Sequence, residues 1–173
     1  VSGSELAITS AGILTFASAP DYETKSTYTA TVTASDGANS TTQDITVNVT
    51  NVNDNSPAFT SNATFSAEEN QTAIGTVVAS DADGDGITYS ISGSDITIDA
   101  SSGVIAFVSA PDYETTISYS ATVTASDGTN TTTQDITVNI QNIPNVSGVA
   151  YTSRYSVMDS DIPNTEYLAY SDN

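Results

Sequence analysis

The sequence predicts an all-β protein built from immunoglobulin-like Greek-key β-sandwiches arranged in tandem, and three observations support this fold class. Two long segments repeat at a fixed separation. Within each copy, apolar and polar residues alternate with a period of two, as in strands with one buried face. The expected strands are separated by turns rich in Gly, Asn, Asp and Ser. No segment carries a convincing 3.6-residue period, so no helix is expected.

The repeat is read directly from the sequence. Residues 19–24 (APDYET) recur at 110–115, and residues 28–37 recur with few changes at 119–128, so both pairs are 91 positions apart. A period this long is typical of a tandem array of whole small domains, because the units of most solenoids are shorter.

The first copy begins within the pattern and is expected to hold the last four strands of a seven-stranded sandwich. Residues 28–34 and 45–49 show the clearest alternation. The strands that would cover this half of a sandwich are not in the first copy. Several apolar side chains are therefore expected to face inward without partners, namely Ile13, Phe16, Tyr28, Val32, Ile45 and Val47.

The second copy adds strands ahead of the shared ones. They are expected at residues 63–66, 76–79, 87–91, 96–98 and 104–108. With the two shared strands this makes about seven short alternating strands, which is the pattern of an immunoglobulin-like sandwich. At least one further strand is expected in the tail, around Val149–Val157.

Composition narrows the range of functions. The net charge is −19, from 21 acidic and 2 basic residues, so nothing is available to neutralise nucleic-acid phosphates. The chain has no Cys and no His, which excludes disulfides, thiolate or imidazole metal sites and Ser–His–Asp catalysis. It also lacks an apolar run of about 20 residues, so no membrane insertion is predicted. Such a charge repels itself and favours bound cations.

Two turn segments are rich in oxygen. Residues 51–57 (NVNDNSP) lie between strand-rich segments, and residues 81–86 (DADGDG) follow about thirty positions later. A hard cation such as Ca²⁺ takes six to eight oxygens in irregular geometry. A cation held at residues 51–57 would therefore fix one domain against the next.

These segments resemble the motifs of the cadherin repeat, in a version that looks bacterial, over roughly residues 1–142. The similar motifs are a first-strand glutamate motif (Ala67–Asn70), a DxD motif (Ala79–Asp83), a DRE-like motif (Asp112–Glu114 and Asp21–Glu23), an AxDxG-type turn (Ala125–Gly128) and a DxNDN-like linker (Asn51–Asn55) in which Asn51 replaces the usual Asp.

The resemblance implies that calcium ions bind at each domain junction. At the first junction the implied ligands come from the upper domain, the linker and the lower domain, and they are Asp21, Glu23, Asn53, Asp54, Asn55 (through its carbonyl), Asp81, Asp83 and Asp127. A weaker second cluster, Glu69, Asp112 and Glu114, would serve the junction at the other end. There Pro144 and Asn145 replace Asn53 and Asp54, so two ligands are lost.

Each of these Asp and Asn residues taken alone is most simply a turn former. The set is harder to explain that way, because five carboxylates are expected to converge, namely Asp21, Glu23, Asp54, Asp81 and Asp83. One unscreened pair of carboxylates 4 Å apart costs roughly 4 kcal/mol at an effective dielectric constant near 20. A bound cation reverses the sign of that interaction.

The domain organisation expected from these patterns has four parts: a C-terminal half-domain at residues 1–52, a calcium-binding linker at 53–56, a complete domain at 57–142, and a tail at 143–173. The tail would start another β module or form an interaction segment. If it supplied a strand to another copy of the chain, it could also build a polymer.

By resemblance, the chain is expected to be a secreted or surface-attached module, stiffened by calcium, that serves adhesion or forms a stalk or filament. Its partners would be another copy, neighbouring domains of the same array or a surface glycan. A glycosidase pair at Asp112 and Glu114 is disfavoured because no aromatic cleft is apparent around it, so no enzymatic activity is expected. The alternative is an accessory module of a secreted enzyme, such as a carbohydrate-binding module.

Overall fold

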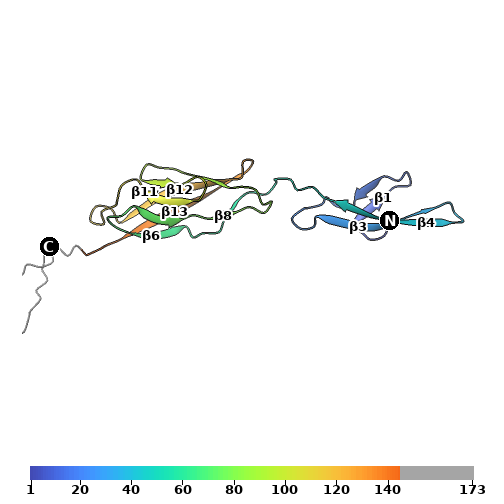
Figure 1. Cartoon of the computed structure of the whole chain (residues 1–173), viewed down its shortest axis with the longest axis horizontal. Coiled ribbons are helices and arrows are strands. Elements are labelled where there is room, and N and C mark those ends of the chain that lie inside the picture. Colours follow the sequence, from blue (N-terminus) through green and yellow to red (C-terminus); the bar gives the residue numbers. More distant parts are fainter. Residues whose placement is uncertain (145–173) are drawn as a thin grey trace, which may run out of the picture.

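The computed structural model of the chain describes residues 1–144, and all of the regular elements in that range are β-strands (Figure 1). The all-β class predicted from the sequence is therefore confirmed. No helix in this range could cross a membrane. The strands fall into two groups joined by an extended segment around residues 49–56, and we call them the N-terminal unit (residues 1–50) and the C-terminal unit (residues 57–141).

The N-terminal unit consists of two antiparallel hairpins. Strand β1 (Leu6–Ile8) pairs with β2 (Leu14–Phe16), and β3 (Thr27–Ser35) pairs with β4 (Ser40–Asn48). The second hairpin keeps one register over its whole length, from Thr27 opposite Asn48 to Ser35 opposite Ser40. Phe16 packs edge-on against Tyr28 and so brings the two hairpins together.

The C-terminal unit contains the remaining nine strands: β5 (Ala58–Phe59), β6 (Thr64–Glu68), β7 (Ala73–Thr76), β8 (Ala79–Ser80), β9 (Thr88–Ile91), β10 (Ile96–Ile98), β11 (Val104–Phe107), β12 (Ser118–Ser126) and β13 (Thr131–Gln141). One sheet has the order β10-β11-β7 and the other the order β6-β13-β12-β9, while β5 and β8 form a short separate pair. The pairing of β6 with β13 is parallel, and all the others are antiparallel.

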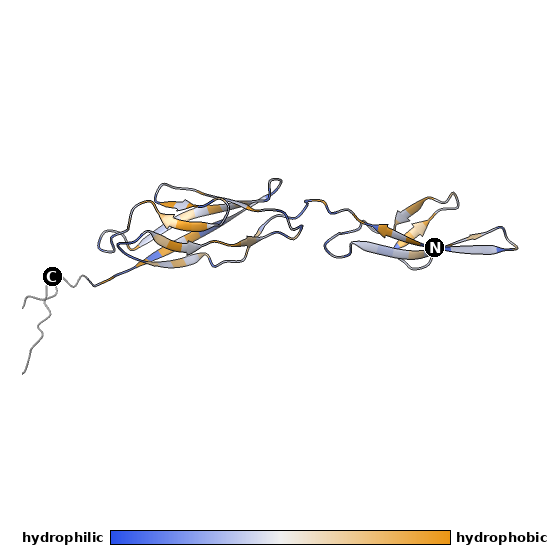
Figure 2. Cartoon of the chain, viewed as in Figure 1, coloured by the Kyte–Doolittle hydropathy of each residue, from blue (hydrophilic) through white to orange (hydrophobic). Residues whose placement is uncertain are grey.

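The core of the C-terminal unit consists of apolar residues contributed by both sheets, as the period-two alternation predicts (Figure 2). Val77, Val123 and Val138 are completely buried, and Ile105 and Ile136 are 1% exposed. Phe107 and Tyr119 pack edge-on beside them. This cluster fixes the positions of the loops at both ends of the unit, where the acidic residues lie.

The repeat is visible in three dimensions. The hairpin β12–β13 has the register of β3–β4 shifted by 91 residues, from Ser118 opposite Asn139 to Ser126 opposite Thr131. A cross-strand hydrogen bond recurs as well: Thr31 Oγ1 donates to Asp44 over 2.7 Å, and Thr122 Oγ1 donates to Asp135 over 2.6 Å. Over the described residues, however, β3 and β4 pair only with each other, whereas β12 also pairs with β9 and β13 with β6.

Two expectations for the strands were wrong. The strand expected at residues 76–79 is interrupted, because β7 ends at Thr76 and β8 begins at Ala79. Between them the chain changes partner: the Val77 N–H donates to the Gly103 carbonyl, and the Val78 carbonyl accepts from Thr60 N–H. Strand β5, which pairs with β8, was not predicted.

The expectation that Ile13 faces inward was also wrong, because its side chain is 60% exposed. Its neighbour Leu14 is half-buried. Since successive side chains of a strand point to opposite faces, Leu14 and Ile13 cannot both face inward. The strand expected around Val149–Val157 lies outside the described residues.

Candidate metal centre at the linker

The linker is anchored to the C-terminal unit chiefly through one carboxylate, that of Asp83. Its Oδ2 accepts hydrogen bonds from the backbone N–H groups of Asp54 (3.1 Å) and Asn55 (2.8 Å), and its Oδ1 accepts one from the Asn55 side chain (3.0 Å). Asn51 adds a further bond from its side-chain amide to the Asp83 carbonyl, over 2.8 Å. An Asp at position 51, as in the motif that it resembles, could not donate this bond.

Asp83 is positioned by the loop between β8 and β9. Asp81 Oδ1 accepts from the backbone N–H groups of Asp83 (2.9 Å) and Asp85 (3.3 Å), and Gly84 adopts the left-handed conformation that this turn requires (φ 83°). The result is that one carboxylate oxygen from each of Asp81, Asp83 and Asp85 lies within 4.8 Å of the others.

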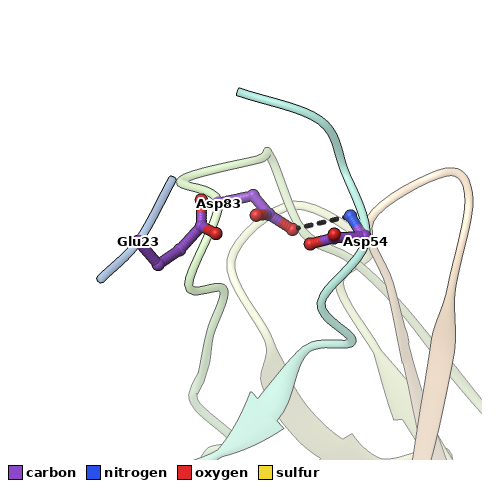
Figure 3. Close-up of side chains that lie close together, drawn as sticks. All are labelled: Glu23, Asp54 and Asp83. Carbon is purple, nitrogen blue, oxygen red and sulfur yellow. Dashed lines mark hydrogen bonds between the residues drawn. The ribbon is translucent and has the colours of Figure 1, made fainter. Parts of the chain in front are cut away.

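A second cluster joins three separate segments. One oxygen each from Glu23, Asp54 and Asp83 lie within 4.8 Å of one another, and these residues come from the turn between β2 and β3, the linker and the β8–β9 loop (Figure 3). The only hydrogen bond between these three runs from the Asp54 backbone to Asp83. The single lysine of the chain, Lys25, forms its ion pair with Glu5 instead, over 2.7 Å.

The pKa values at this cluster move in opposite directions. Loss of solvent raises the pKa of Glu23, and the neighbouring Asp83 carboxylate raises it further. The pKa of Asp83 is lowered, chiefly because the Asn55 N–H bonds to its carboxylate, and this effect outweighs desolvation. The site thus holds Asp83 as an anion and places Glu23 where a further negative charge is unfavourable.

Two carboxylate oxygens at this end of the C-terminal unit are buried without a partner among the described residues: Oδ2 of Asp81 and Oδ2 of Asp127. The other oxygen of Asp127 is satisfied, because it accepts from the backbone N–H groups of Thr129 (2.7 Å) and Asn130 (2.6 Å). A buried acceptor left unpaired is unfavourable, and for an ionised group the cost is larger. A hard cation that takes oxygen ligands would satisfy both atoms, so the donor set fits calcium.

The sequence-predicted residues are distributed as follows. Glu23, Asp54 and Asp83 are brought together, and Asp81 joins Asp83 in the second group. The Asn53 side-chain oxygen and the Asn55 carbonyl accept hydrogen bonds from the same amide, that of Asn130.

Asp21 lies in the turn that carries Glu23, and its predicted role as a calcium ligand stays a prediction. It is absent from the three-carboxylate cluster with Glu23. Its carboxylate accepts from the N–H groups of Glu23 and Thr24 and from the Thr24 hydroxyl, so it closes the turn that carries Glu23. These bonds, that of the Thr24 hydroxyl first, lower its pKa.

Sequence reasoning missed two residues of this centre. Asp85 continues the spacing of Asp81 and Asp83 at every second position, and this spacing is the signal that could have found it. Asn130 lies in a loop whose composition gives no sign of a role beyond the turn.

The predicted weaker cluster lies at the opposite end of the C-terminal unit. Single oxygens of Glu69, Asp112 and Glu114 lie within 4.8 Å of one another. Glu69 is only 2% exposed, and its two oxygens accept from the backbone N–H groups of Ile143 (2.8 Å) and Tyr113 (3.1 Å). The backbone N–H of Glu114 bonds to its own carboxylate and lowers its pKa. The nearby Asp112 carboxylate, desolvation and the Glu69 charge have the opposite effect, and together they raise the pKa of Glu114 above its ordinary value. Asn145, expected to weaken this site, lies outside the described residues.

Comparison with known proteins finds similarity to cadherin proteins. The family described as "Cadherin domain" matches residues 63–141. Human protocadherin Fat 1 is 35% identical over 157 residues, which is 80% of this chain and 3% of that protein. Human cadherin EGF LAG seven-pass G-type receptor 1 is 36% identical over 141 residues, which is 73% of this chain and 5% of that protein. The chain therefore spans only a small part of these relatives. Because they are animal proteins, they give no support to the expected bacterial version.

Solved structures agree with the sequence matches. A protocadherin gammaB7 cis-dimer structure matches 83% of this chain and 39% of its own, with a TM-score of 0.69 and 27% identity. The extracellular cadherin domains 3–6 of protocadherin gamma B2 match the same share of each chain, with a TM-score of 0.70 and 25% identity.

Proposed function

We propose that this chain, in which residues 63–141 are a cadherin domain, is a segment of an extracellular tandem array whose domains are held in line by calcium. Cadherin domains are extracellular modules of adhesion-type proteins and are not enzymes. The observation that carries the proposal is the convergence of Glu23, Asp54 and Asp83 from the two units and the linker between them. With no basic residue in this cluster, the carboxylates repel one another unless a cation joins them.

The residues that would hold calcium are those of the linker centre. Asp21 and Glu23 would contribute from the N-terminal unit; Asn53, Asp54 and the Asn55 carbonyl from the linker; and Asp81, Asp83 and Asp127 from the C-terminal unit. Calcium would supply positive charge and accept these oxygens as ligands. Because the ligands come from both units, binding favours the ordered junction over flexible ones and stiffens the array. Glu69, Asp112 and Glu114 would contribute in the same way to a junction at the other end.

In this proposal residues 1–52 belong to one domain, 53–56 are the calcium-binding linker, and 57–142 form the next domain. The partners are neighbouring domains of the same array and adhesive protein surfaces. Carbohydrate binding gains no support, because a sugar-binding face needs a row of exposed aromatic rings. Among the described residues, Tyr22 is the only aromatic residue with more than about a third of its surface exposed, at 38%.

The test is to remove calcium from the intact chain with a chelator and to measure thermal unfolding and small-angle X-ray scattering. We expect chelation to lower the melting temperature and broaden the distribution of angles between the units. A ligand present at 100 times its Kd stabilises by about 2.7 kcal/mol, so the shift should be readily measured. Identical melting and scattering curves with and without calcium would refute the proposal.

A matched pair of variants locates the effect. Asp83 belongs to both carboxylate clusters and anchors the linker, whereas Asp85 belongs to one and makes no bond to the linker among the described residues. We expect Asp83→Asn to weaken calcium binding at least roughly tenfold, and Asp85→Asn to weaken it only about two- to threefold, because one charge in several is lost. Equal losses in a calorimetric titration would place the ion away from Asp83.

A further inference from the structure

One side chain outside the linker, an amide and not a carboxylate, also forms hydrogen bonds with the linker. The side-chain amide of Asn130, in the loop between β12 and β13, donates to Asn53 Oδ1 over 2.9 Å and to the Asn55 carbonyl over 3.0 Å. All three residues are half-buried. A single NH₂ group thus holds two linker oxygens that are 77 and 75 positions away from it in the sequence.

The loop fixes where this amide points. Asp127 Oδ1 accepts from the Asn130 N–H over 2.6 Å, and the Asn130 carbonyl accepts from the Asp127 N–H over 3.3 Å. Gly128 takes the left-handed conformation needed to close the turn (φ 94°). With its backbone held at both polar groups, Asn130 can reach the linker only in a narrow range of directions.

The two oxygens that Asn130 holds are also the two linker oxygens, besides the Asp54 carboxylate, assigned above as calcium ligands. A carbonyl-type oxygen has two lone pairs, so it can accept an N–H bond and still face a cation. An ion that finds both oxygens already in place does not have to order the linker when it binds, and preorganisation of this kind raises affinity.

We propose that Asn130 is a positioning residue: its side-chain amide holds Asn53 Oδ1 and the Asn55 carbonyl in place before calcium arrives, and in this way raises the calcium affinity of the linker centre. We call the two hydrogen bonds from the Asn130 amide to Asn53 and Asn55 the clamp. The inference rests on the proposed function for its calcium step, but the clamp itself needs no ion. Asn130 touches the ligands and is not one of them.

The repeat supplies a matched control. Asn39 is the equivalent residue of the N-terminal unit, 91 positions earlier, and its backbone makes the same bonds to Asp36, over 2.7 and 3.2 Å. Over the described residues no hydrogen bond joins Asn39 to a linker. Asn39→Ala therefore removes the same side chain from the same type of turn without removing a clamp.

The experiment compares the full chain with its Asn130→Ala and Asn39→Ala variants. In chelator, hydrogen exchange reports whether the amides of residues 53–56 are protected. We expect exchange there to accelerate roughly tenfold in Asn130→Ala, the equivalent of two ordinary hydrogen bonds, and to stay unchanged in Asn39→Ala. Calorimetry should show calcium affinity falling by a similar factor in Asn130→Ala alone. Unchanged linker exchange in that variant would overturn the clamp.

A second variant, Asn130→Asp, keeps the shape of the side chain and replaces the donor group by an oxygen. The clamp predicts that it loses linker protection in chelator as fully as the alanine variant does. If Asn130 instead turned its amide oxygen toward the ion as a ligand, linker exchange in chelator would be the same in Asn130→Asp as in the natural chain, and that result would overturn the proposal. Should calcium bind to none of the proteins, the proposed function fails, while the exchange data in chelator still decide whether the clamp exists.

Discussion

The two units carry nearly the same hairpin sequence in different surroundings. Val123, Ile136 and Val138 are at most 1% exposed, whereas the same residue types at the equivalent positions of the N-terminal unit, Val32, Ile45 and Val47, are only half-buried. The hairpin register is the same in both units. Pairing of the hairpin is therefore a local property, and burial is conferred by the neighbours: β12 and β13 are flanked by β9 and β6, and β3 and β4 are not.

The polar loops of the two hairpins also differ because of their surroundings. Asp36 and Asp127 each accept backbone N–H bonds within their own turns, and Asn39 and Asn130 close those turns in the same way. Among the described residues, only the second loop meets a linker, and only there does a side chain reach across to it. One sequence acts as a plain turn in the first unit and as part of a candidate metal centre in the second.

The largest expected difference between the units concerns a pair of equivalent glycines, Gly103 and Gly12. Both have positive φ, but a Cβ on Gly103 would lie 2.2 Å from the Val77 carbonyl oxygen, whereas one on Gly12 would meet nothing within 4 Å. Gly12→Ala should therefore cost only the strain of the left-handed conformation, roughly 1–2 kcal/mol. Gly103→Ala adds a clash with the backbone and should cost more than about 3 kcal/mol.

Urea denaturation, with hydrogen exchange to assign each transition to a unit, measures both effects. Similar losses of unfolding free energy in the two glycine variants would mean that the N-terminal unit is packed as tightly as the C-terminal unit at this turn. That result would contradict the difference inferred between the units.

The next difference concerns the apolar interior. Ile136→Ala removes a side chain that is 1% exposed, so we expect it to cost about 2–5 kcal/mol, the range for large-to-small changes in a core. Ile45→Ala removes the same atoms from a half-buried position and should cost less than half as much, because less surface is exposed and no closed cavity forms. The same denaturation assay tests this, and a larger loss at Ile45 would contradict it.

The smallest expected difference is a dependence on pH. The pKa of Asp99 is held well below its ordinary value of 3.8, first by the Ser101 hydroxyl and then by the Ser102 N–H and hydroxyl. A lowered pKa means that the folded state favours the anion. The stabilisation is therefore fully present at pH above about 4 and is lost as the pH falls below that value. Asp99→Asn should lower the melting temperature slightly at neutral pH and flatten its decline between about pH 4 and pH 2.

Thr9, which follows β1 in the N-terminal unit as Asp99 follows β10, provides the control. Its hydroxyl oxygen accepts from the Ile13 N–H over 3.1 Å and cannot titrate in this range. Thr9→Val should therefore change stability by the same amount at every pH, whereas a pH-dependent effect of this variant would show that Asp99 is not the source of the acid sensitivity.

Much of the fold could be predicted because alternation is a local signal. The strands expected at residues 96–98 and 104–108 are close to β10 (Ile96–Ile98) and β11 (Val104–Phe107). The signal failed where tertiary pairing decides. Strand β5 is two residues long, too short to alternate, and it exists because β8 lies beside it. Val77 and Val78 continue the apolar pattern, so the sequence predicts one strand there. The backbone nevertheless changes its hydrogen-bonding partner between these two residues, and the strand is interrupted.

The candidate site could be predicted in composition and only partly in detail. Motif order indicated that Glu23, Asp54 and Asp83 would meet, and these residues do lie together. Composition cannot show which oxygens the backbone already satisfies, such as those of Asp21, whose carboxylate also closes its own turn. Nor can it show that an amide such as Asn130 reaches a linker more than seventy residues away.

Over the described residues the outer borders of β3 and β4 pair with no further strand, and this affects how the protein behaves at high concentration. An open strand border is a template on which a strand of another chain can add. A lysine on the border would oppose this pairing, but neither β3 nor β4 contains one. What keeps molecules apart is long-range repulsion from a net charge of −19. Each bound calcium ion would remove two of those charges, and added salt would screen the rest. If calcium orders the linker as proposed, the conditions that do so therefore also lower colloidal solubility.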